Sequence, residues 1–434
     1  MIATIIVSLI TVVFIIASIL FFPRLQFKKI SFDTYWVAAL IGASVILILN
    51  LVKEETVWQN LTNDSEINPL KILSLFLAMT LLSVFLDELG FFHYVANWAH
   101  QKAKNKQASV FLWFYIVVSI LTIFTSNDII ILTFTPFICS FARKAKINPL
   151  PYLISEFIAA NTWSNMLIIG NPTNIYLATS FGIDFFEYFK VMWLPSVTAG
   201  LTSLALTYFI FRKDLKAPIE KSVEQVKLPN KALLLIGLIH LGGCTILLSM
   251  SSYIQIPMWF ISLIFATSLI VSALLYQLFT KSRQPLLSNT IKRLPWNLIP
   301  FVLSMFIMVL ALKEHDITLY LSHLFEGSFA FFGIGAFFFA NVLNNIPMSV
   351  MFAEVLRPLS AATLPASLYA VILASNIGAY LTPIGALAGI MWMNILKREQ
   401  VSLSFIAFIK KNALIAMITM GVALATLAWT LSSI

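Results

Sequence analysis

Hydrophobic residues come in runs of roughly 20 along this chain, and short polar stretches separate the runs. A helix of that length, rising about 1.5 Å per residue, crosses the roughly 30 Å hydrocarbon core of a bilayer. The pattern predicts ten membrane-spanning helices, at about 1–21, 34–52, 71–87, 152–178, 190–211, 231–250, 257–278, 297–312, 366–395 and 412–432. The predicted fold class is therefore an all-α polytopic membrane protein.

Two further apolar segments, 110–142 and 327–356, carry polar residues at their midpoints. The first contains Thr125-Ser126-Asn127-Asp128, and the second contains the polar stretch 341–347. Polar residues at membrane depth interrupt a simple span. Each segment is therefore interpreted as a re-entrant helical hairpin, whose two ends lie on the same side of the membrane.

The charged residues support this topology. Only 11% of the residues are charged, against about 25% in soluble domains. With the N-terminus outside, all but five of the 28 Lys and Arg residues fall in predicted cytoplasmic segments, as in most inner-membrane proteins. The five exceptions are Lys53, Lys71, Lys190, Lys313 and Arg357. The net charge of +9 is thus explained by topology, and the basic residues form no soluble patch for nucleic acid.

The two halves of the sequence resemble each other. The segment 160–170 aligns without gaps with 375–385, so that Asn161 falls on Asn376 and Gly170 on Gly385. In the hairpins, Asn127-Asp128 falls on Asn344-Asn345, and the order of the motifs is the same in both halves. Five spans is an odd number, so the second half must enter the membrane from the opposite side. We therefore expect two inverted repeats, each with five spans, one hairpin and one broken helix.

The repeats set the predicted boundaries. The first repeat is 1–211, with its hairpin at 110–142 and its broken helix at 152–178. The cytoplasmic linker is 212–230, and the second repeat is 231–434, with its hairpin at 327–356 and its broken helix at 366–395. The apolar N-terminus lacks a basic n-region, so it is predicted to be a first span and not a cleaved signal.

Four polar segments at membrane depth are the candidate site. Two are the hairpin tips, and two are helix breaks rich in Gly, Pro and Asn, which can free carbonyls for a cation and helix N-termini for an anion. Such residues can also serve only as helix–helix contacts, but two symmetric pairs of clusters favour a binding function. The candidate substrate- or ion-binding residues are Ser126, Asn127, Asp128, Asn161, Thr162, Gly170, Asn171, Pro172, Thr173, Asn174, Asn344, Asn345, Pro347, Asn376, Gly378, Thr382, Pro383 and Gly385.

Asp128 is the clearest intramembrane acid, and an acid at that depth is a functional hypothesis by default. It is the predicted coupling residue, for either H⁺ or Na⁺, with a purely structural acid as the alternative. Glu156 is interpreted as an interfacial acid near a cytoplasmic helix start. The sequence contains no Walker A motif, no nucleophile–base motif and no Cys/His cluster, so no enzyme activity, cofactor or metal site is predicted.

Several of these stretches carry a family resemblance. Phe124–Pro136, Pro295–Ser322 and Leu381–Trp392 closely resemble the arsenite/antimonite efflux permeases (ArsB-type) of the ion-transporter superfamily, and Asn344–Pro347 resembles their paired-asparagine turn. The resemblance implies proton-coupled efflux of arsenite or antimonite by alternating access across the bacterial inner membrane. It also admits a soluble ATPase partner, and small-residue packing faces leave open whether the chain is a homodimer.

The sequence is also compatible with other substrates. The break at Ile169–Ile175 looks more like that of sodium/proton antiporters, and Asn376–Tyr380 departs from the arsenite permeases. The alternatives are a sodium/proton antiporter, or a sodium-coupled transporter of carboxylates or inorganic anions; a non-transporting receptor would not need the polar breaks. Arsenite at neutral pH is largely the neutral trihydroxide, which amides and hydroxyls could bind. A three-thiolate site is excluded, because Cys139 and Cys244 are the only two cysteines.

Overall fold

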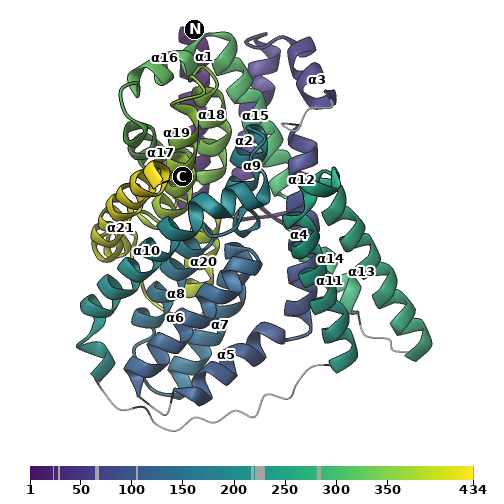
Figure 1. Ribbon diagram of the computed structural model, residues 1–434, viewed down its shortest axis with the longest axis vertical. Coiled ribbons are helices and arrows are strands. Elements are labelled where there is room, and N and C mark those ends of the chain that lie inside the picture. Colours follow the sequence, from purple (N-terminus) through teal and green to yellow (C-terminus); the bar gives the residue numbers. More distant parts are fainter. Residues whose placement is uncertain are drawn as a thin grey trace.

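The computed structural model describes residues 1–22, 24–27, 30–63, 68–103, 106–216, 219, 230–280 and 285–433, and it is almost entirely helical (Figure 1). The elements of the first half are α1 (Ile2–Phe21), β1 (Arg24–Phe27), β2 (Ile30–Asp33), α2 (Tyr35–Ile48), α3 (Glu54–Thr62), α4 (Pro69–Glu88), α5 (Phe91–Lys102), α6 (Gln107–Phe124), α7 (Asn127–Lys144), α8 (Leu150–Trp163), the 3₁₀ turn η1 (Ile168–Gly170), α9 (Pro172–Ser180) and α10 (Phe185–Phe211).

The second half of the chain is also helical. Its elements are η2 (Asp214–Lys216), α11 (Lys231–Ser249), α12 (Ser251–Ile254), α13 (Met258–Thr280), α14 (Leu286–Lys292), α15 (Leu298–Glu314), α16 (Ile317–Leu324), α17 (Phe329–Leu343), α18 (Asn345–Leu356), α19 (Leu364–Ile377), η3 (Gly378–Tyr380), α20 (Leu387–Arg398) and α21 (Phe405–Ser433). Most of the predicted linker 212–230 lies outside the described residues. So do seven basic residues of the predicted cytoplasmic segments: Lys28, Lys29, Lys104, Lys221, Lys227, Lys281 and Arg283.

The all-α fold class is confirmed, with one small exception. Seven of the described helices are long and apolar enough to cross a membrane, or eight if the bent pair α15–α16 counts as one span. The exception is the antiparallel pair β1–β2, in which Arg24 is opposite Asp33 and Phe27 is opposite Ile30. The sequence analysis predicts no element between the spans 1–21 and 34–52, although four-residue strands with alternating polarity fit this segment. The count of ten spans, the inverted repeat and the orientation stay predictions.

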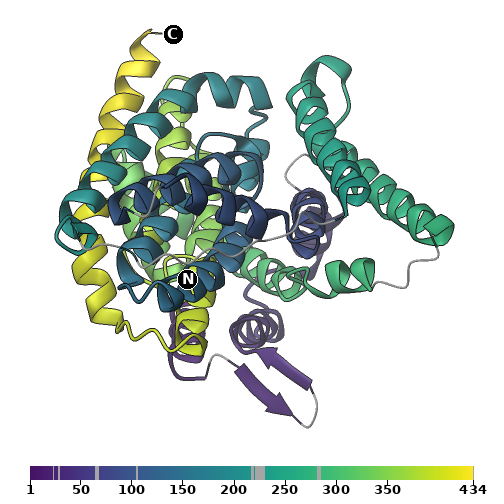
Figure 2. The same ribbon diagram turned by 90° about the horizontal axis from the view of Figure 1, so that it is seen from below.

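The helices form a large body and a smaller arm (Figures 1 and 2). In the body, α10 lies beside α21 and α17 beside α19. The arm consists of α11 and α13, which pack against α4 and stand apart from the rest in Figure 2. The two halves interlock within the body, because α7 packs against α20 and α18 packs against α9. One helix of each predicted hairpin thus contacts a helix of the predicted broken helix in the other half.

Both predicted hairpins appear as helix pairs with tips shorter than predicted. α6 and α7 are separated only by Thr125 and Ser126, and α17 and α18 only by Asn344. Asn127, Asp128 and the stretch 345–347 are already helical. The N–H groups in the first turn of a helix have no partner within the helix. Polar side chains that accept from them, and a proline that lacks an N–H, are therefore favoured at these positions.

Asparagine residues cap the N-termini of the helices that follow two of the interruptions. The Asn171 side chain accepts from the Thr173 N–H at 3.1 Å with Pro172 in the first helical turn, and the Asn344 side chain accepts from the Ile346 N–H at 3.4 Å. Asn344 has a φ of 76°, a left-handed conformation that asparagine tolerates better than most residues. The local sequence therefore explains where α9 and α18 begin.

Candidate functional site

The two broken helices meet each other through one buried asparagine, Asn376, at the end of α19. Its Oδ1 accepts from Asn171 Nδ2 and from Ser164 Oγ, both at 2.7 Å. Its Nδ2 donates to Asn174 Oδ1 at 2.7 Å and to the Ile372 carbonyl at 2.9 Å. Asn376 is 0% exposed. These bonds join the break of the first half to the break of the second half in a single polar network.

Smaller contacts extend this network. Thr173 Oγ1 lies 2.9 Å from Ser375 Oγ, and Thr162 Oγ1 donates to the Tyr380 hydroxyl at 3.3 Å. The first break begins at Ser164, earlier than predicted, and Pro172–Asn174 already belong to α9. The structure therefore brings Thr162, Asn171, Thr173, Asn174 and Asn376 together, as the sequence suggested, with Ser164 and Ser375 as further members.

The second hairpin tip is bonded to the second break. The Asn345 N–H donates to the Gly385 carbonyl at 2.9 Å, and Asn344 Nδ2 donates to the Ile384 carbonyl at 3.1 Å. Asn341, on α17, donates to the Gly378 carbonyl at 3.0 Å and accepts from Thr382 Oγ1 at 2.7 Å. Asn341 was not among the predicted site residues, although an amide in an otherwise apolar helix is a signal for it. Pro347 is buried in the first turn of α18.

The first hairpin tip is bonded through a side chain to α8, the first helix of the first broken pair. Asn127 Nδ2 donates to Asn161 Oδ1 at 3.1 Å. The Oδ1 atoms of Asn127 and Asn345 and the Oγ of Ser126 are buried, and no described residue bonds to them. Buried polar atoms are seldom left unpaired. Both tips therefore present free oxygens, of the kind that a hydroxyl-bearing solute or a cation would bind.

Asp128 lies on the wall of a cavity of about 240 Å³. Its side chain is half-buried, and no hydrogen bond or ion pair reaches its carboxylate from the described residues. The same cavity is lined by Tyr35 and Asp33 from the segment around α2, and by Asn394 and Arg398 from α20. The predicted coupling acid is thus unpaired and reachable, next to the Asn127–Asn161 contact.

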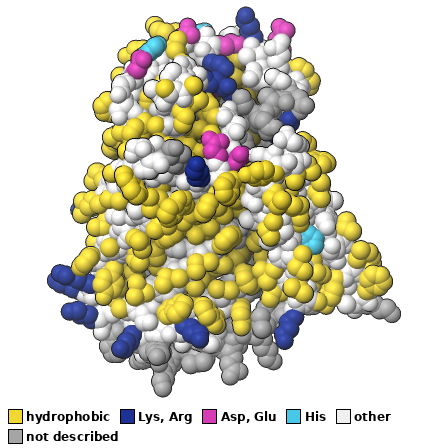
Figure 3. Space-filling view, viewed as in Figure 1, with side chains coloured by type: hydrophobic (Ala, Val, Ile, Leu, Met, Phe, Trp, Pro, Cys, Tyr) yellow, Lys and Arg dark blue, Asp and Glu magenta, His cyan; other side chains and the backbone are white. Residues whose placement is uncertain are grey.

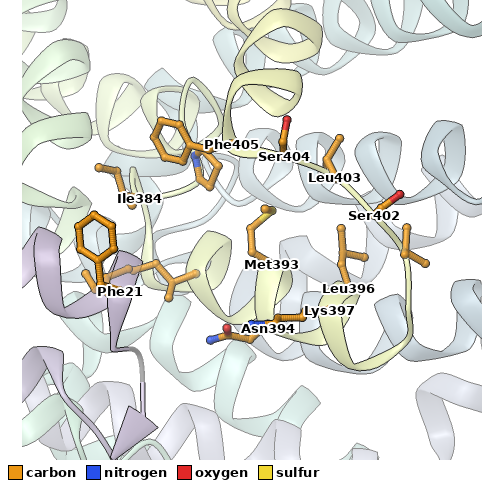
Figure 4. Close-up of a pocket in the computed structure, with 14 residues that line it drawn as sticks. Phe21, Ile384, Met393, Asn394, Leu396, Lys397, Ser402, Leu403, Ser404 and Phe405 are labelled. Carbon is orange, nitrogen blue, oxygen red and sulfur yellow. The ribbon is translucent and has the colours of Figure 1, made fainter.

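A second cavity, of about 510 Å³, lies beside the second break (Figure 4). Pro383 and Ile384 contribute from the break, and Asn394 and Lys397 from α20. The two cavities share Ile19, Ile390 and Asn394, so they flank α20 and the end of α1. Both reach the end of α20, where Lys397 lines the larger cavity and Arg398 the smaller one.

Gly170 is required by the close packing of the first break. A Cβ placed on Gly170 would lie 2.3 Å from the Ser164 carbonyl oxygen, which is backbone and cannot move aside. We expect Gly170→Ala to abolish transport and to lower thermal stability, because the break must shift. Gly421→Ala is the matched control, since nothing lies within 4 Å of a Cβ at Gly421. Thermal unfolding of the two purified variants compares them, and equal melting temperatures would contradict this account.

Glu156 corrects the sequence analysis. The sequence predicts an interfacial acid, but Glu156 is 0% exposed in the middle of α8. Thr135 Oγ1 donates to both of its carboxylate oxygens at 3.0 and 3.1 Å, and Trp392 Nε1 donates to Oε2 at 3.4 Å. These partners are 21 and 236 residues away in sequence, so no local pattern could reveal them.

The surface of the molecule fits a membrane. Figure 3 shows a wide belt of hydrophobic side chains, with Lys and Arg side chains gathered below it. Large apolar side chains such as Phe260, Leu275 and Phe279 on α13 are exposed. Soluble proteins rarely expose apolar surface on this scale. The fold, the belt and the buried polar network together define a multi-pass membrane transporter.

Comparison with known proteins identifies the family. The profile of the CitMHS family, described as citrate transporters, matches residues 2–367, and the chain belongs to this family. It is 25% identical over 370 residues to an arsenical pump membrane protein of Yersinia enterocolitica, covering 82% of this chain and 86% of that protein. It is 24% identical over 411 residues to an arsenical pump membrane protein of Escherichia coli K12, covering 91% and 93%.

A solved structure supports the fold. The YdaH transporter of Alcanivorax borkumensis, reported to have an unusual topology, superposes with a TM-score of 0.59 over 99% of this chain and 98% of that one. The two sequences are 12% identical, so this likeness concerns the fold alone. The family relationship inferred from the motifs is thus confirmed.

Proposed function

We propose that this chain is a proton-coupled secondary transporter that exports arsenite or antimonite across the bacterial inner membrane. One observation carries the proposal: Asp128, whose carboxylate has no partner among the described residues, lines a cavity and directly follows Asn127, which bonds to Asn161 on the first broken helix. Asp128 would exchange the coupling proton, and the network would hold the substrate. The inverted repeats would let the site face each side in turn.

The chemistry of the network suits a neutral polyhydroxyl solute. Its hydrogen-bonding side chains are amides and hydroxyls, and these can donate to and accept from the three hydroxyls of arsenite. Cys139 and Cys244 are both buried, and the Cys244 thiol contacts Met79 Sδ at 3.6 Å, so thiolate binding is not part of the proposal. The names of the relatives, arsenical pump membrane proteins, point to the same substrate.

The arrangement of cavities and ion pairs supports an inward-facing state. Arg398 and Lys397, which line the two cavities, belong to a segment predicted to be cytoplasmic. At the predicted outer end, Glu354 on α18 is 8% exposed and pairs with Lys313 on α15 at 2.8 Å and with Arg357 at 2.7 Å. We propose that these pairs close the outer side, and that they separate when the site turns outward.

A second candidate is export or uptake of an organic anion such as citrate. The observation in its favour is the basic pair Lys397 and Arg398 at the cavities, together with the description of the family as citrate transporters. A tricarboxylate would also need positive charge near Asn376, where the described side chains within hydrogen-bonding distance are neutral. Only helix N-termini or a bound cation could supply it there.

Everted membrane vesicles test the proposal. With labelled arsenite, a respiratory substrate and no ATP, we expect accumulation that depends on this chain and that an uncoupler collapses. The absence of ATP separates this activity from one driven by an ATPase partner. Accumulation of citrate in place of arsenite would support the second candidate. Accumulation that requires a sodium gradient and survives the uncoupler would overturn proton coupling.

A further inference from the structure

Glu156 is the most deeply buried acid among the described residues. It is 0% exposed and lies seven residues into α8, the first arm of the first broken helix. Its partners come from two other elements: Thr135 belongs to the hairpin arm α7, and Trp392 belongs to α20 of the second half. One carboxyl group therefore links α8 to α7 and to α20 of the second half.

The hydrogen bonds of Glu156 come only from neutral groups. Thr135 and Trp392 each donate, and none of the ion pairs among the described residues includes Glu156. A buried carboxylate without a cationic partner is very costly in free energy. Two neutral donors offset only part of that cost. A carboxylic acid in the same place would keep both contacts and carry no charge.

The other titratable groups of the surrounding elements do not supply a counter-charge. On α7, Arg143 pairs with Glu399 at 2.9 Å and not with Glu156. None of the printed ion pairs among the described residues joins Glu156 to a basic group on the surrounding elements. The ionisable groups on those elements are Asp128, Cys139, Arg143 and Lys144 on α7, Lys397 and Arg398 on α20, Tyr115 on α6, Tyr152 on α8, Glu187, Tyr188, Lys190 and Tyr208 on α10, Tyr369 on α19, Tyr380 on η3, and Lys410 and Lys411 on α21.

We propose that Glu156 is a second proton-binding site, distinct from Asp128, which holds a proton in the conformation described here. Thr135, which bonds to Glu156, lies about 10 Å along α7 from Asp128, because the two residues are seven positions apart in the helix. The neutral acid keeps α7 and α20 packed together at Thr135 and Trp392. Release of the proton would leave a buried anion, so α7 and α20 must separate and admit water before Glu156 can ionise.

Infrared difference spectroscopy of the purified protein tests the protonation directly. A protonated carboxyl has a C=O stretch that is separate from the carboxylate bands. We expect the wild-type protein at neutral pH to show such a band, Glu156→Gln to lose it, and the surface control Glu399→Gln to keep it. The same spectrum in Glu156→Gln as in the wild type would overturn the proposal, because Glu156 would then be ionised.

A second variant keeps the test decisive if Glu156→Gln folds poorly. Thr135→Val leaves the acid in place but removes a donor, so the C=O band should move to higher frequency. A band that stays at its wild-type position would show that it does not arise from Glu156 and would overturn the proposal.

Transport assays ask whether the proton is used. The inference rests on the proposed proton coupling but not on the substrate, and the infrared result stands even if arsenite is not transported. In proteoliposomes, Glu156→Gln should retain exchange of labelled for unlabelled substrate but lose accumulation driven by a pH gradient. Wild-type accumulation by this variant, with an unchanged pH profile, would reduce Glu156 to a structural acid.

Discussion

Asp128→Asn is expected to reduce gradient-driven transport to the level of vesicles without the protein, while the protein stays folded. Because no hydrogen bond or ion pair of the described residues reaches the Asp128 carboxylate, an amide of the same size breaks no contact. The amide cannot bind and release a proton, so the cycle loses its driving force. Accumulation in everted vesicles, with thermal unfolding measured on the same preparation, checks both halves of the expectation.

Asp33 provides the matched control for Asp128. It lines the same cavity but accepts a hydrogen bond from Asn297 Nδ2 at 3.0 Å, so it has a structural role. We expect Asp33→Asn to retain most of the uncoupler-sensitive accumulation. If Asp128→Asn retains it as well, coupling does not run through Asp128. If both variants lose it, the charge of the cavity as a whole matters and not Asp128 in particular.

The sequence predicted the fold class because the bilayer imposes a simple rule on hydrophobic length. It predicted the helix breaks because Gly, Pro and Asn mark them, and Asn171, Pro172 and Asn344 do act as helix starts. It misplaced the start of the first break, since Ser164 and Asn165 are not obvious helix breakers. Their side chains bond to the carbonyls of Asn161 and Thr162, which weakens the helix at that point.

The contacts within the site could not be predicted from the sequence, because they form between residues of the two halves. Asn376 bonds to Asn171 and Asn174, which lie 205 and 202 residues away in the sequence. No local pattern indicates these partners. Glu156 was misjudged for the same reason. Its position near a helix start suggested an interface, but α7 and α20 cover it from both halves. Long-range packing decides which polar residues are buried and which are paired.

We expect Asn376→Leu to destabilise the protein and Asn412→Leu not to destabilise it. Both asparagines are 0% exposed, so the substitution removes a buried amide of similar size in each case. Asn376 bonds to side chains from both breaks, and leucine would leave Asn171 Nδ2 and Asn174 Oδ1 without these partners. Each buried group left unpaired costs about 1–3 kcal/mol, so a loss of roughly 2–6 kcal/mol is expected.

Asn412, on α21, has no hydrogen-bond partner among the described residues for either its Nδ2 or its Oδ1. Replacing a buried amide that is unpaired by an apolar group removes a desolvation cost and breaks no bond, so Asn412→Leu should be neutral or stabilising. Thermal unfolding of the two purified variants measures the contrast, and vesicle uptake should be lost only in Asn376→Leu. Equal destabilisation by the two substitutions would mean that burial alone, and not the hydrogen bonds of Asn376, stabilises the contact between the two breaks. Intact uptake by Asn376→Leu would show that the Asn376 network is not part of the transport site.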